Sequence, residues 1–361
     1  MTSLRTSGTC RIVGAGLLGT SIGLALTKAG LDVVIEDATP TNARLAIDYG
    51  AGRKASESDD PSIIVVCVPP DVTASVVAAE LERFPNAVVT DVASVKSSIL
   101  QDLTTRGADL SRYLGSHPMA GRERGGALSG RADLFIARPW VLAVHESASA
   151  RAVSAVEDLA LDLGAIPSRM SPEAHDRAVA LVSHAPQVVS SLLAARLANA
   201  DASDVALAGQ GLRDTTRIAA SDPKLWLQIL GANADSVRTV LTGFQDDLAS
   251  VISALEDTDA SGALAVIGDA LSAGNRGVEK IPGKHGSNAT AYSFVVVLID
   301  DKPGQLAKLL TEVGEAGINL EDLKLEHSPG AAVGLVELAV LPAVEQKLVA
   351  ELTSRGWRLA G

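Results

Sequence analysis

The segment Gly115–Gly126, with the sequence Gly-Ser-His-Pro-Met-Ala-Gly-Arg-Glu-Arg-Gly-Gly, groups side chains that can handle protons and anions. It contains the imidazole of His117 and the carboxylate of Glu123 beside two arginines. An imidazole has an ordinary pKa of about 6.5, so His117 can accept and return a proton near neutral pH. Because glycine and proline weaken helices and strands, we expect a loop that presents these groups. The alternative is a solvated surface loop.

A second motif, Gly14-Ala15-Gly16-Leu17-Leu18-Gly19, lies between a strand expected over Cys10–Val13 and a helix expected over Gly19–Ala29. Such glycines permit a tight turn and let the backbone approach a pyrophosphate, which the helix N-terminus stabilises. The next strand, Asp32–Ile35, is followed by Glu36 and Asp37 at the distance typical of a dinucleotide-binding unit. Asp37 would accept hydrogen bonds from the ribose and repel a 2′-phosphate, which predicts NAD rather than NADP. The residues predicted to bind the cofactor are Gly14, Gly16, Leu17, Leu18, Gly19, Asp37, Val68 and Pro69.

The composition fits a globular protein and restricts its partners. The 361 residues predict two or three domains, and 3% aromatic content predicts an aliphatic core. A net charge of −12 argues against a nucleic-acid surface. Cys10 and Cys67 lie in apolar runs, which indicates buried thiols in a reducing compartment. We find no secretory signal and no apolar run near the roughly 18 residues of a membrane span, so we expect a cytoplasmic protein without membrane or metal partners.

Alternating strands and helices predict a doubly wound α/β domain over residues 9–170. The further strands expected are Ser62–Val68, Ala87–Thr90, Tyr113–Ser116, Trp140–Val144 and Ile166–Met170, with helices over Val72–Arg83 and Ala148–Leu163. The segment Asp91–Lys96 follows one strand, at the sheet edge where ligands bind. Its Ser94 is a candidate for contact with substrate or, alternatively, for the cap of a helix that begins at Val95.

Residues 171–273 show helical periodicity, and Ser171-Pro172-Glu173 is typical of a helix start. The expected helices are Glu173–Ser183, Pro186–Ala198, Lys224–Asp247 and Leu248–Leu255. Their apolar faces exceed what one small bundle can bury, so we expect a homodimer. A glycine-rich linker is expected over residues 274–289, before a βαββαβ unit over residues 290–361. Its expected elements are Tyr292–Ile299, Gly304–Gly314, Asn319–His327, Val333–Val340, Ala343–Ser354 and Trp357–Leu359.

Taken together, these motifs resemble the prephenate and arogenate dehydrogenases of tyrosine biosynthesis. The resemblance rests on Gly14–Gly19, Asp91–Lys96, Gly115–Gly121, Val182–Pro186 and Leu212–Ala219, which contains Arg-Asp-Thr-Thr-Arg-Ile-Ala. The C-terminal unit resembles an ACT domain through Asp301–Leu306 and Gly317–Asn319. The resemblance implies an NAD-binding Rossmann domain of the 6-phosphogluconate-dehydrogenase type, an all-α dimerisation domain and a C-terminal ACT domain.

The family reaction is an NAD⁺-dependent oxidative decarboxylation of a cyclohexadienol. By resemblance, His117 accepts the hydroxyl proton and Ser94 orients the hydroxyl or the imidazole. Arg217 would bind the ring carboxylate through its two-donor fork, with Asp214 orienting the arginine. For Arg217, a surface arginine on a helix is the alternative. Activity should then rise with pH through a group that titrates near the ordinary histidine pKa of about 6.5.

Four more residues are assigned to the substrate pocket by the same resemblance. Glu123 would gate the entrance, and Trp226 would belong to the pocket, with the partner subunit as its source. His184 is either a structural hydrogen bonder or a pocket residue. Gln187 stands where family members often carry a second histidine, so the preference between prephenate and arogenate is left open.

The sequence disfavours two other functions. A β-hydroxyacid dehydrogenase would use a lysine in a glycine-rich helix, and residues 171–200 contain no such segment. A non-catalytic amino-acid sensor is disfavoured by Ser94, His117 and Arg217 occurring together. The ACT resemblance implies an effector, most plausibly tyrosine, at Asp301, Pro303, Gly304 and Asn319, and the alternative is a purely structural domain.

Overall fold

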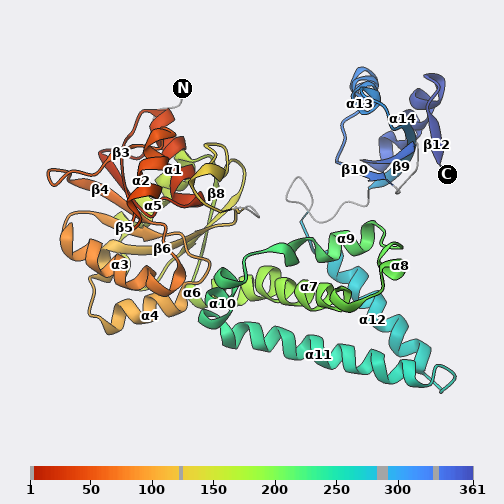
Figure 1. Ribbon diagram of the computed structural model, residues 1–361, viewed down its shortest axis with the longest axis horizontal. Helices are drawn as coiled ribbons and strands as arrows, with labels where there is room; N and C mark the ends of the chain where they lie inside the picture. The colour runs from red at the N-terminus through yellow and green to blue at the C-terminus, as the bar shows by residue number, and fades with distance from the viewer. Residues whose placement is uncertain (1–3, 122–124, 283–291, 328–332, 361) are drawn as a thin grey trace. The chain divides into compact units, whose positions relative to one another are not determined.

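The computed structural model describes residues 4–121, 125–282, 292–327 and 333–360 (Figure 1). The chain divides into two compact units. The first comprises Met1–Ala200 and Thr215–Phe244, and the second comprises Asp201–Asp214 and Gln245–Gly361.

The first unit is built on an eight-stranded sheet with the order β3-β2-β1-β4-β5-β6-β7-β8. Strands β1 to β6 are parallel, β7 runs antiparallel to β6, and β8 is parallel to β7. The predicted doubly wound domain is confirmed, whereas the reversed β7 was not predicted. The strands are β1 Thr9–Val13, β2 Asp32–Glu36, β3 Arg53–Lys54, β4 Pro61–Val66, β5 Val88–Asp91, β6 Tyr113–Pro118, β7 Pro139–Ala143 and β8 Ile166–Met170.

Helices cover both faces of this sheet because its central strands are apolar throughout. Ile63 and Val65 of β4 join one buried cluster, and the alternate Ile64 and Val66 join another, as expected for side chains on opposite faces. The first cluster includes residues of α1 and α5, and the second includes residues of α3 and α4. The helices are α1 Leu17–Ala29, α2 Pro40–Asp48, α3 Pro70–Arg83, α4 Ser97–Thr105 and α5 Ala150–Asp162. Strand β1 lies between β2 and β4, so chain connections depart to both sides there, and open α/β sheets commonly bind ligands at the carboxyl edge of such a point.

Helices also follow the sheet in the first unit. Ser171 caps α6 as predicted, because its hydroxyl accepts a hydrogen bond from the N–H of Ala174 at 3.2 Å. The long helix expected from Lys224 is interrupted at Asn233, which ends α10. The elements are α6 Pro172–Val179, the π-helical turn η3 Ala180–His184, α7 Ala185–Ala195, the 3₁₀ turns η4 Arg196–Asn199 and η5 Arg217–Ala220, and α10 Pro223–Ala232. Helix α11 Ala234–Glu256 begins in the first unit and continues into the second.

The continuous helical run Pro172–Asn199 is long and apolar enough to cross a membrane by length and composition alone. The expectation that no run reaches this length is therefore wrong. The run also carries buried polar groups, His175, Asp176, His184 and Gln187, that bond within the folded unit.

The second unit contains a four-stranded antiparallel sheet with the order β10-β11-β9-β12 and a core of its own. Strands and helices alternate as βαββαβ, which confirms the predicted order. Helix α12 continues through Gly274 to Val278, into the segment predicted as linker. The elements are α8 Ala202–Val205, α9 Gln210–Thr216, α12 Ala263–Val278, β9 Ser293–Asp300, α13 Gln305–Glu315, β10 Asp322–His327, β11 Val333–Val340, α14 Pro342–Ser354 and β12 Arg358–Ala360.

Candidate active site

The glycine-rich turn after β1 has the stereochemistry that a dinucleotide requires. Gly14 has a φ of 108°, and a Cβ there would collide with the carbonyl oxygen of Cys67. A Cβ at Gly19 would collide with the carbonyl oxygen of Gly14, so α1 packs closely against the turn. Around Gly16, by contrast, nothing lies within 4 Å, which leaves room for a ligand at the N-terminus of α1. This cradle fits the pyrophosphate of NAD.

The acidic pair after β2 has two different environments. Asp37 accepts hydrogen bonds from the N–H of Ala15 at 2.7 Å and from the N–H of Thr39 at 2.7 Å, so its carboxylate lies against the glycine-rich turn. Glu36 forms an ion pair with the buried Arg11, whose guanidinium donates a hydrogen bond to the Glu36 carboxylate at 2.5 Å. The charge of Glu36 is thus offset by an arginine, and a contact of Asp37 with the cofactor ribose stays a prediction.

His117 lies in a strand, and the prediction that it belongs to a loop is wrong. Strand β6 continues through Pro118, because β7 pairs with it antiparallel and His117 opposes Val141. The pairing of β5 with β6 sets Asp91 opposite Gly115, so His117 lies near the carboxyl edge shared with the glycine-rich turn. The ladder supplies the backbone hydrogen bonds that glycine and proline were expected to prevent.

The imidazole of His117 belongs to a chain of three side chains. Its Nδ1 lies 2.9 Å from Nε2 of His175, and Nδ1 of His175 lies 2.8 Å from Oδ1 of Asp176. Asp176 also accepts hydrogen bonds from the N–H of Lys96 at 2.9 Å and the N–H of Ser97 at 2.8 Å. Helix α6 is thereby held against the N-terminus of α4, and His175 and Asp176 are both buried.

A buried ion pair lies beside this chain. Lys96 pairs with Asp91 and donates to the carbonyl oxygen of Ser116 at 2.9 Å. Asp91 also accepts hydrogen bonds from the hydroxyl of Tyr113 at 2.7 Å and the N–H of Ala93 at 2.8 Å. Lys96 is 1% exposed and Asp91 is fully buried, so each charge depends on the other and on these donors.

These surroundings keep His117 neutral. Burial lowers its pKa well below the ordinary value of 6.5, and electrostatic interactions with His175, Lys96 and His184 lower the pKa further, against the opposing interaction with Asp176. For Asp176, burial raises the pKa, but hydrogen bonds from His175, Ser97 and Lys96 outweigh it and leave the pKa below its ordinary value. At neutral pH the site therefore pairs a neutral imidazole with an ionised carboxylate, and the expected titration near 6.5 moves to lower pH.

Ser94 is half-buried after β5 and no side-chain hydrogen bond is formed by it within the described residues. It does not cap a helix, because α4 begins at Ser97 rather than at Val95. The N–H groups at the start of α4 are capped instead by Asp176, which comes from α6. A contact of Ser94 with substrate stays a prediction.

Three predicted pocket residues occupy one region of the first unit. His184 is buried, and Asn233 lies 3.2 Å from its Nδ1 while donating to the carbonyl oxygen of Asp176 at 2.8 Å. Burial lowers the pKa of His184 to about 4, so this ring is neutral too. Trp226 packs its ring edge-on against His184, with 6.0 Å between centroids. Gln187 is buried and donates to Ser191 at 3.3 Å.

The remaining predicted substrate residues lie elsewhere in the chain. Arg217 begins the turn η5 and is exposed, on an element that packs against α7. Asp214 lies in α9, where it accepts a hydrogen bond from Gln210 at 2.8 Å. The orientation of Arg217 by Asp214 stays a prediction. Glu123 lies outside the described residues.

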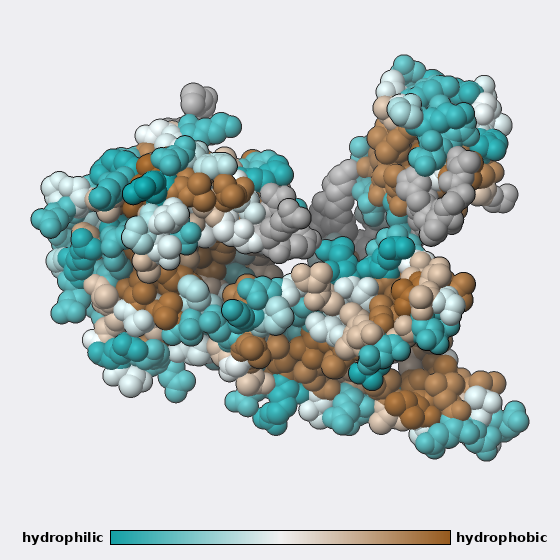
Figure 2. Space-filling view, viewed as in Figure 1, coloured by the Kyte–Doolittle hydropathy of each residue, from teal (hydrophilic) through white to brown (hydrophobic). Residues whose placement is uncertain are grey.

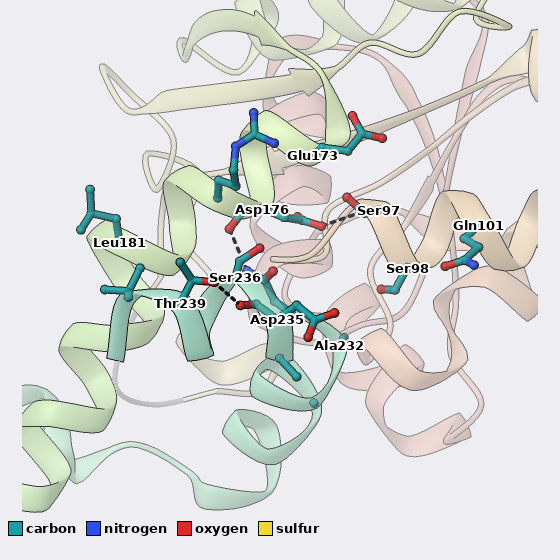
Figure 3. Close-up of a pocket in the computed structure, with 15 residues that line it drawn as sticks. Ser97, Ser98, Gln101, Glu173, Asp176, Leu181, Ala232, Asp235, Ser236 and Thr239 are labelled. Carbon is teal, nitrogen blue, oxygen red and sulfur yellow. Dashed lines mark hydrogen bonds between the residues drawn. The ribbon is translucent and has the colours of Figure 1, made fainter. Parts of the chain in front are cut away.

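A cavity of about 690 Å³ is lined in part by Asp176 (Figure 3). Residues of α4, α6, α10 and α11 line it, among them Ser97, Glu173 and Asp235. Neither His117 nor any residue predicted to bind substrate or cofactor lines this cavity. We therefore assign the active site by the chemistry around His117 and not by cavity size.

Sequence reasoning missed His175, Asp176 and the pairing of Lys96 with Asp91. The segment Asp91–Lys96 and the helix start at Ser171 were both recognised. An adjacent His-Asp pair in the first turns of that helix was the available signal. The sequence could not show how α6 packs against β6 and α4, which joins residues 58 and 80 positions apart.

Comparison with known proteins identifies the family of this chain. Residues 22–167 match the nucleotide-binding domain of prephenate dehydrogenase, and residues 171–267 match its dimerization domain. A probable prephenate dehydrogenase of Streptomyces niveus, NovF, is 36% identical over 97% of this chain and 98% of its own length. The prephenate dehydrogenase of Bacillus subtilis is 24% identical over 92% of this chain and 91% of its own. A crystal structure of prephenate dehydrogenase from A. aeolicus with hydroxyphenyl propionate and NAD⁺ superposes with a TM-score of 0.66 at 25% identity, covering 76% of this chain and 99% of that one. The chain is therefore an NAD-dependent dehydrogenase that belongs to the prephenate dehydrogenase family.

Proposed function

We propose that this protein catalyses the oxidative decarboxylation of prephenate to 4-hydroxyphenylpyruvate in tyrosine biosynthesis. The observation that carries the proposal is the hydrogen-bonded chain of His117, His175 and Asp176 at the same sheet edge as the glycine-rich turn. The relative from Streptomyces niveus supports the substrate, since its similarity extends over nearly the whole chain.

The residues divide the reaction between them. NAD⁺, held by Gly14–Gly19 and Asp37, supplies when bound the nicotinamide that takes up hydride from the ring carbon. His117 accepts the proton of the hydroxyl on that carbon, so the O–H electron pair forms a carbonyl as hydride leaves. Loss of CO₂ then pushes the C–C electron pair into the ring, which becomes aromatic as a phenolate. His117 returns the proton to the phenolate oxygen, so the reaction releases no net proton.

A spectrophotometric assay of NAD⁺ reduction tests the proposal directly. Prephenate, arogenate and 6-phosphogluconate are offered in parallel to the full chain. Reduction with prephenate supports the proposal. Arogenate is the second candidate, since the neutral Gln187 replaces a histidine that could be cationic. Turnover of 6-phosphogluconate alone, or of none of the three, would contradict the assignment.

Arg217→Ala is expected to raise KM for prephenate far more than it lowers kcat. Arg217 is proposed to bind the ring carboxylate, and removal of a charge-assisted fork costs about 1.5–3 kcal/mol, or roughly 10–150-fold in binding. Steady-state kinetics with both substrates held in excess measure the split. Arg213→Ala, which removes an exposed arginine four residues earlier, is the matched control and should change KM little. Equal effects of the two variants would contradict the role of Arg217.

The protein is expected to prefer NAD⁺ strongly over NADP⁺, and Asp37→Ser is expected to narrow that preference. The ionised carboxylate beside the N-terminus of α1 repels a 2′-phosphate, and serine removes that charge. The ratio of kcat/KM for the two cofactors measures the effect. Glu36→Gln is the control, because Arg11 already offsets the charge of Glu36. Equal efficiency with both cofactors in the unsubstituted protein would refute the assignment.

We further propose a soluble, cytoplasmic homodimer formed through the helical region. Residues 171–267 match a dimerization domain, and large apolar side chains are exposed on these helices (Figure 2). They include Leu181, Val182, Leu192, Leu227, Phe244, Leu248, Ile252 and Leu255. Partner chains commonly cover such surfaces. Sedimentation of the full chain at micromolar concentration tests this, and a stable monomer would contradict it.

The C-terminal βαββαβ unit is proposed to be an ACT domain that binds tyrosine. Its sheet order is that of a ferredoxin-like plait, and the turn Asp301–Gly304 leads into α13 with Gly304 at a φ of 88°. Asn319 lies just before β10, and its side-chain amide donates a hydrogen bond to the carboxylate of Glu321 at 3.1 Å. Calorimetry with tyrosine is expected to show heat of binding that Asn319→Ala weakens. Absence of binding heat with tyrosine, phenylalanine and tryptophan would contradict the proposal and indicate a purely structural domain.

A further inference from the structure

We infer that His175 and Asp176 are positioning residues that hold His117 with its proton on Nδ1. His175 receives that proton while the substrate's proton occupies Nε2 of His117, and Asp176 stays an anion beside His175. The kinetic part of this inference rests on the proposed function. Neither residue was recognised from the sequence. Both come from α6, outside the sheet that carries His117, and both are buried.

The hydrogen-bonding capacity of each group fixes the direction of the chain. An ionised carboxylate only accepts, so Nδ1 of His175 donates to Asp176 across the 2.8 Å contact. A neutral imidazole has one donor and one acceptor, so Nε2 of His175 must accept. Nδ1 of His117, 2.9 Å away, is then the donor. The unshared pair of His117 is left on Nε2, which forms no hydrogen bond with the described residues and can meet a substrate hydroxyl.

Asp176 is ionised and held in place by contacts independent of the histidines. It accepts hydrogen bonds from two backbone N–H groups at the N-terminus of α4, that of Lys96 at 2.9 Å and that of Ser97 at 2.8 Å. Figure 3 shows the contact with Ser97. A helix N-terminus stabilises a negative charge. Asn233 donates to the backbone carbonyl of Asp176 and restrains the same turn of α6. The carboxylate is thus a fixed anion at the end of the chain.

The proton balance of the proposed reaction requires a temporary acceptor. When the hydroxyl O–H bond breaks, an N–H bond forms at Nε2 of His117. As the Nδ1–H bond of His117 breaks, an N–H bond forms at Nε2 of His175. The positive charge then lies on His175, beside the carboxylate of Asp176. The same transfers run backwards when the phenolate takes its proton, so no proton needs to leave the site.

The charges around His117 favour the transfer of positive charge from His117 to His175. Burial opposes a positive charge on His117, and the ammonium of Lys96 after β5 repels one. His184 of η3 adds to that repulsion when it is protonated, and Asp91 is already paired with Lys96. The anion that faces the two histidines from α6 is Asp176. A charge moved from His117 to His175 therefore moves away from a cation and towards an anion.

The first experiment needs no substrate. Nitrogen NMR of the full chain labelled with ¹⁵N-histidine reports which ring nitrogen carries the proton, and the spectrum of His117→Asn assigns the His117 signals. We expect the Nδ1–H form for His117 at pH 7 in the unsubstituted protein, and a mixture of the two forms in His175→Ala and Asp176→Asn. Glu173→Gln removes an exposed carboxylate from the same helix and should leave the signals unchanged.

The second experiment is the pH profile of prephenate turnover. His175→Gln and Asp176→Asn are expected to lower kcat by about 10²-fold, the lower end for general acid–base work, with little change in KM. Their acidic limbs should lie at lower pH than in the unsubstituted protein, because His117 alone is a weaker base than the supported pair. A role only in folding would lower the melting temperature without moving the limb, and this outcome would overturn the inference.

The two experiments separate the inference from the proposed function. An Nε2–H form of His117 in the unsubstituted protein would overturn the inference even if prephenate is turned over. The Nδ1–H form, lost in Asp176→Asn, would support the inference even if prephenate and arogenate both fail as substrates.

Discussion

His117→Asn is expected to lower kcat by about 10²–10⁴-fold while KM changes little, because general bases contribute on that scale. Asparagine keeps a hydrogen-bonding group in the space of the imidazole but cannot accept a proton. In the unsubstituted protein, activity should be low at acid pH, rise through a pKa well below 6.5 and stay level through neutrality, since the base works deprotonated and burial lowers its pKa. The pH dependence of kcat/KM with prephenate measures both effects.

The control for this variant is His145→Gln. His145 is a half-buried histidine after β7 that contacts the carbonyl oxygen of Tyr113 at 3.1 Å and lies outside the proposed site. It should keep the activity of the unsubstituted protein and its acidic limb. If His117→Asn retained a near-normal kcat with its acidic limb intact, His117 would not be the base and the central assignment would fail.

Lys96→Met is expected to destabilise the protein by about 3–5 kcal/mol, the usual cost of removing one partner from a buried ion pair. Methionine fills much of the same space but leaves Asp91 charged and fully buried, and leaves the carbonyl oxygen of Ser116 without its donor. Native stabilities are typically about 5–15 kcal/mol, so this loss is a large share of the total. The shift of the urea unfolding midpoint, followed by near-UV circular dichroism, measures it.

Arg106→Met is the matched control, because Arg106 forms an ion pair with Asp102 at 2.9 Å on the exposed side of α4. An exposed pair is worth about 0–1 kcal/mol, so this variant should unfold near the original midpoint. Adding Asp91→Asn to Lys96→Met should recover part of the lost stability, since the uncompensated charge is then gone. Equal midpoints for Lys96→Met and Arg106→Met would contradict the role of the buried pair.

The sequence by itself determined the features that depend on local patterns. The spacing of apolar residues predicted the doubly wound sheet, because buried parallel strands are continuous apolar runs and the helices between them are amphipathic. The glycines at 14, 16 and 19 predicted the cofactor turn, since close backbone contacts leave no room for a side chain at Gly14 and Gly19, and the space around Gly16 stays open for a ligand. Ser171 predicted the start of α6 through its capping hydroxyl. His117 stood out by its residue type and its neighbours.

The tertiary structure decided what depends on groups far apart in the chain. Local propensity assigned His117 to a loop. Pairing with β7 instead supplies hydrogen bonds to the backbone of this segment, so β6 extends through Pro118. Asn233 interrupts the helix predicted from Lys224, and its side chain bonds to Asp176 instead. The partners of His117 are some sixty residues away, on a helix whose register relative to β6 no local pattern encodes. The chemistry of the imidazole could be predicted from its type, whereas its tautomer and low pKa arise from burial and neighbours that only packing brings together.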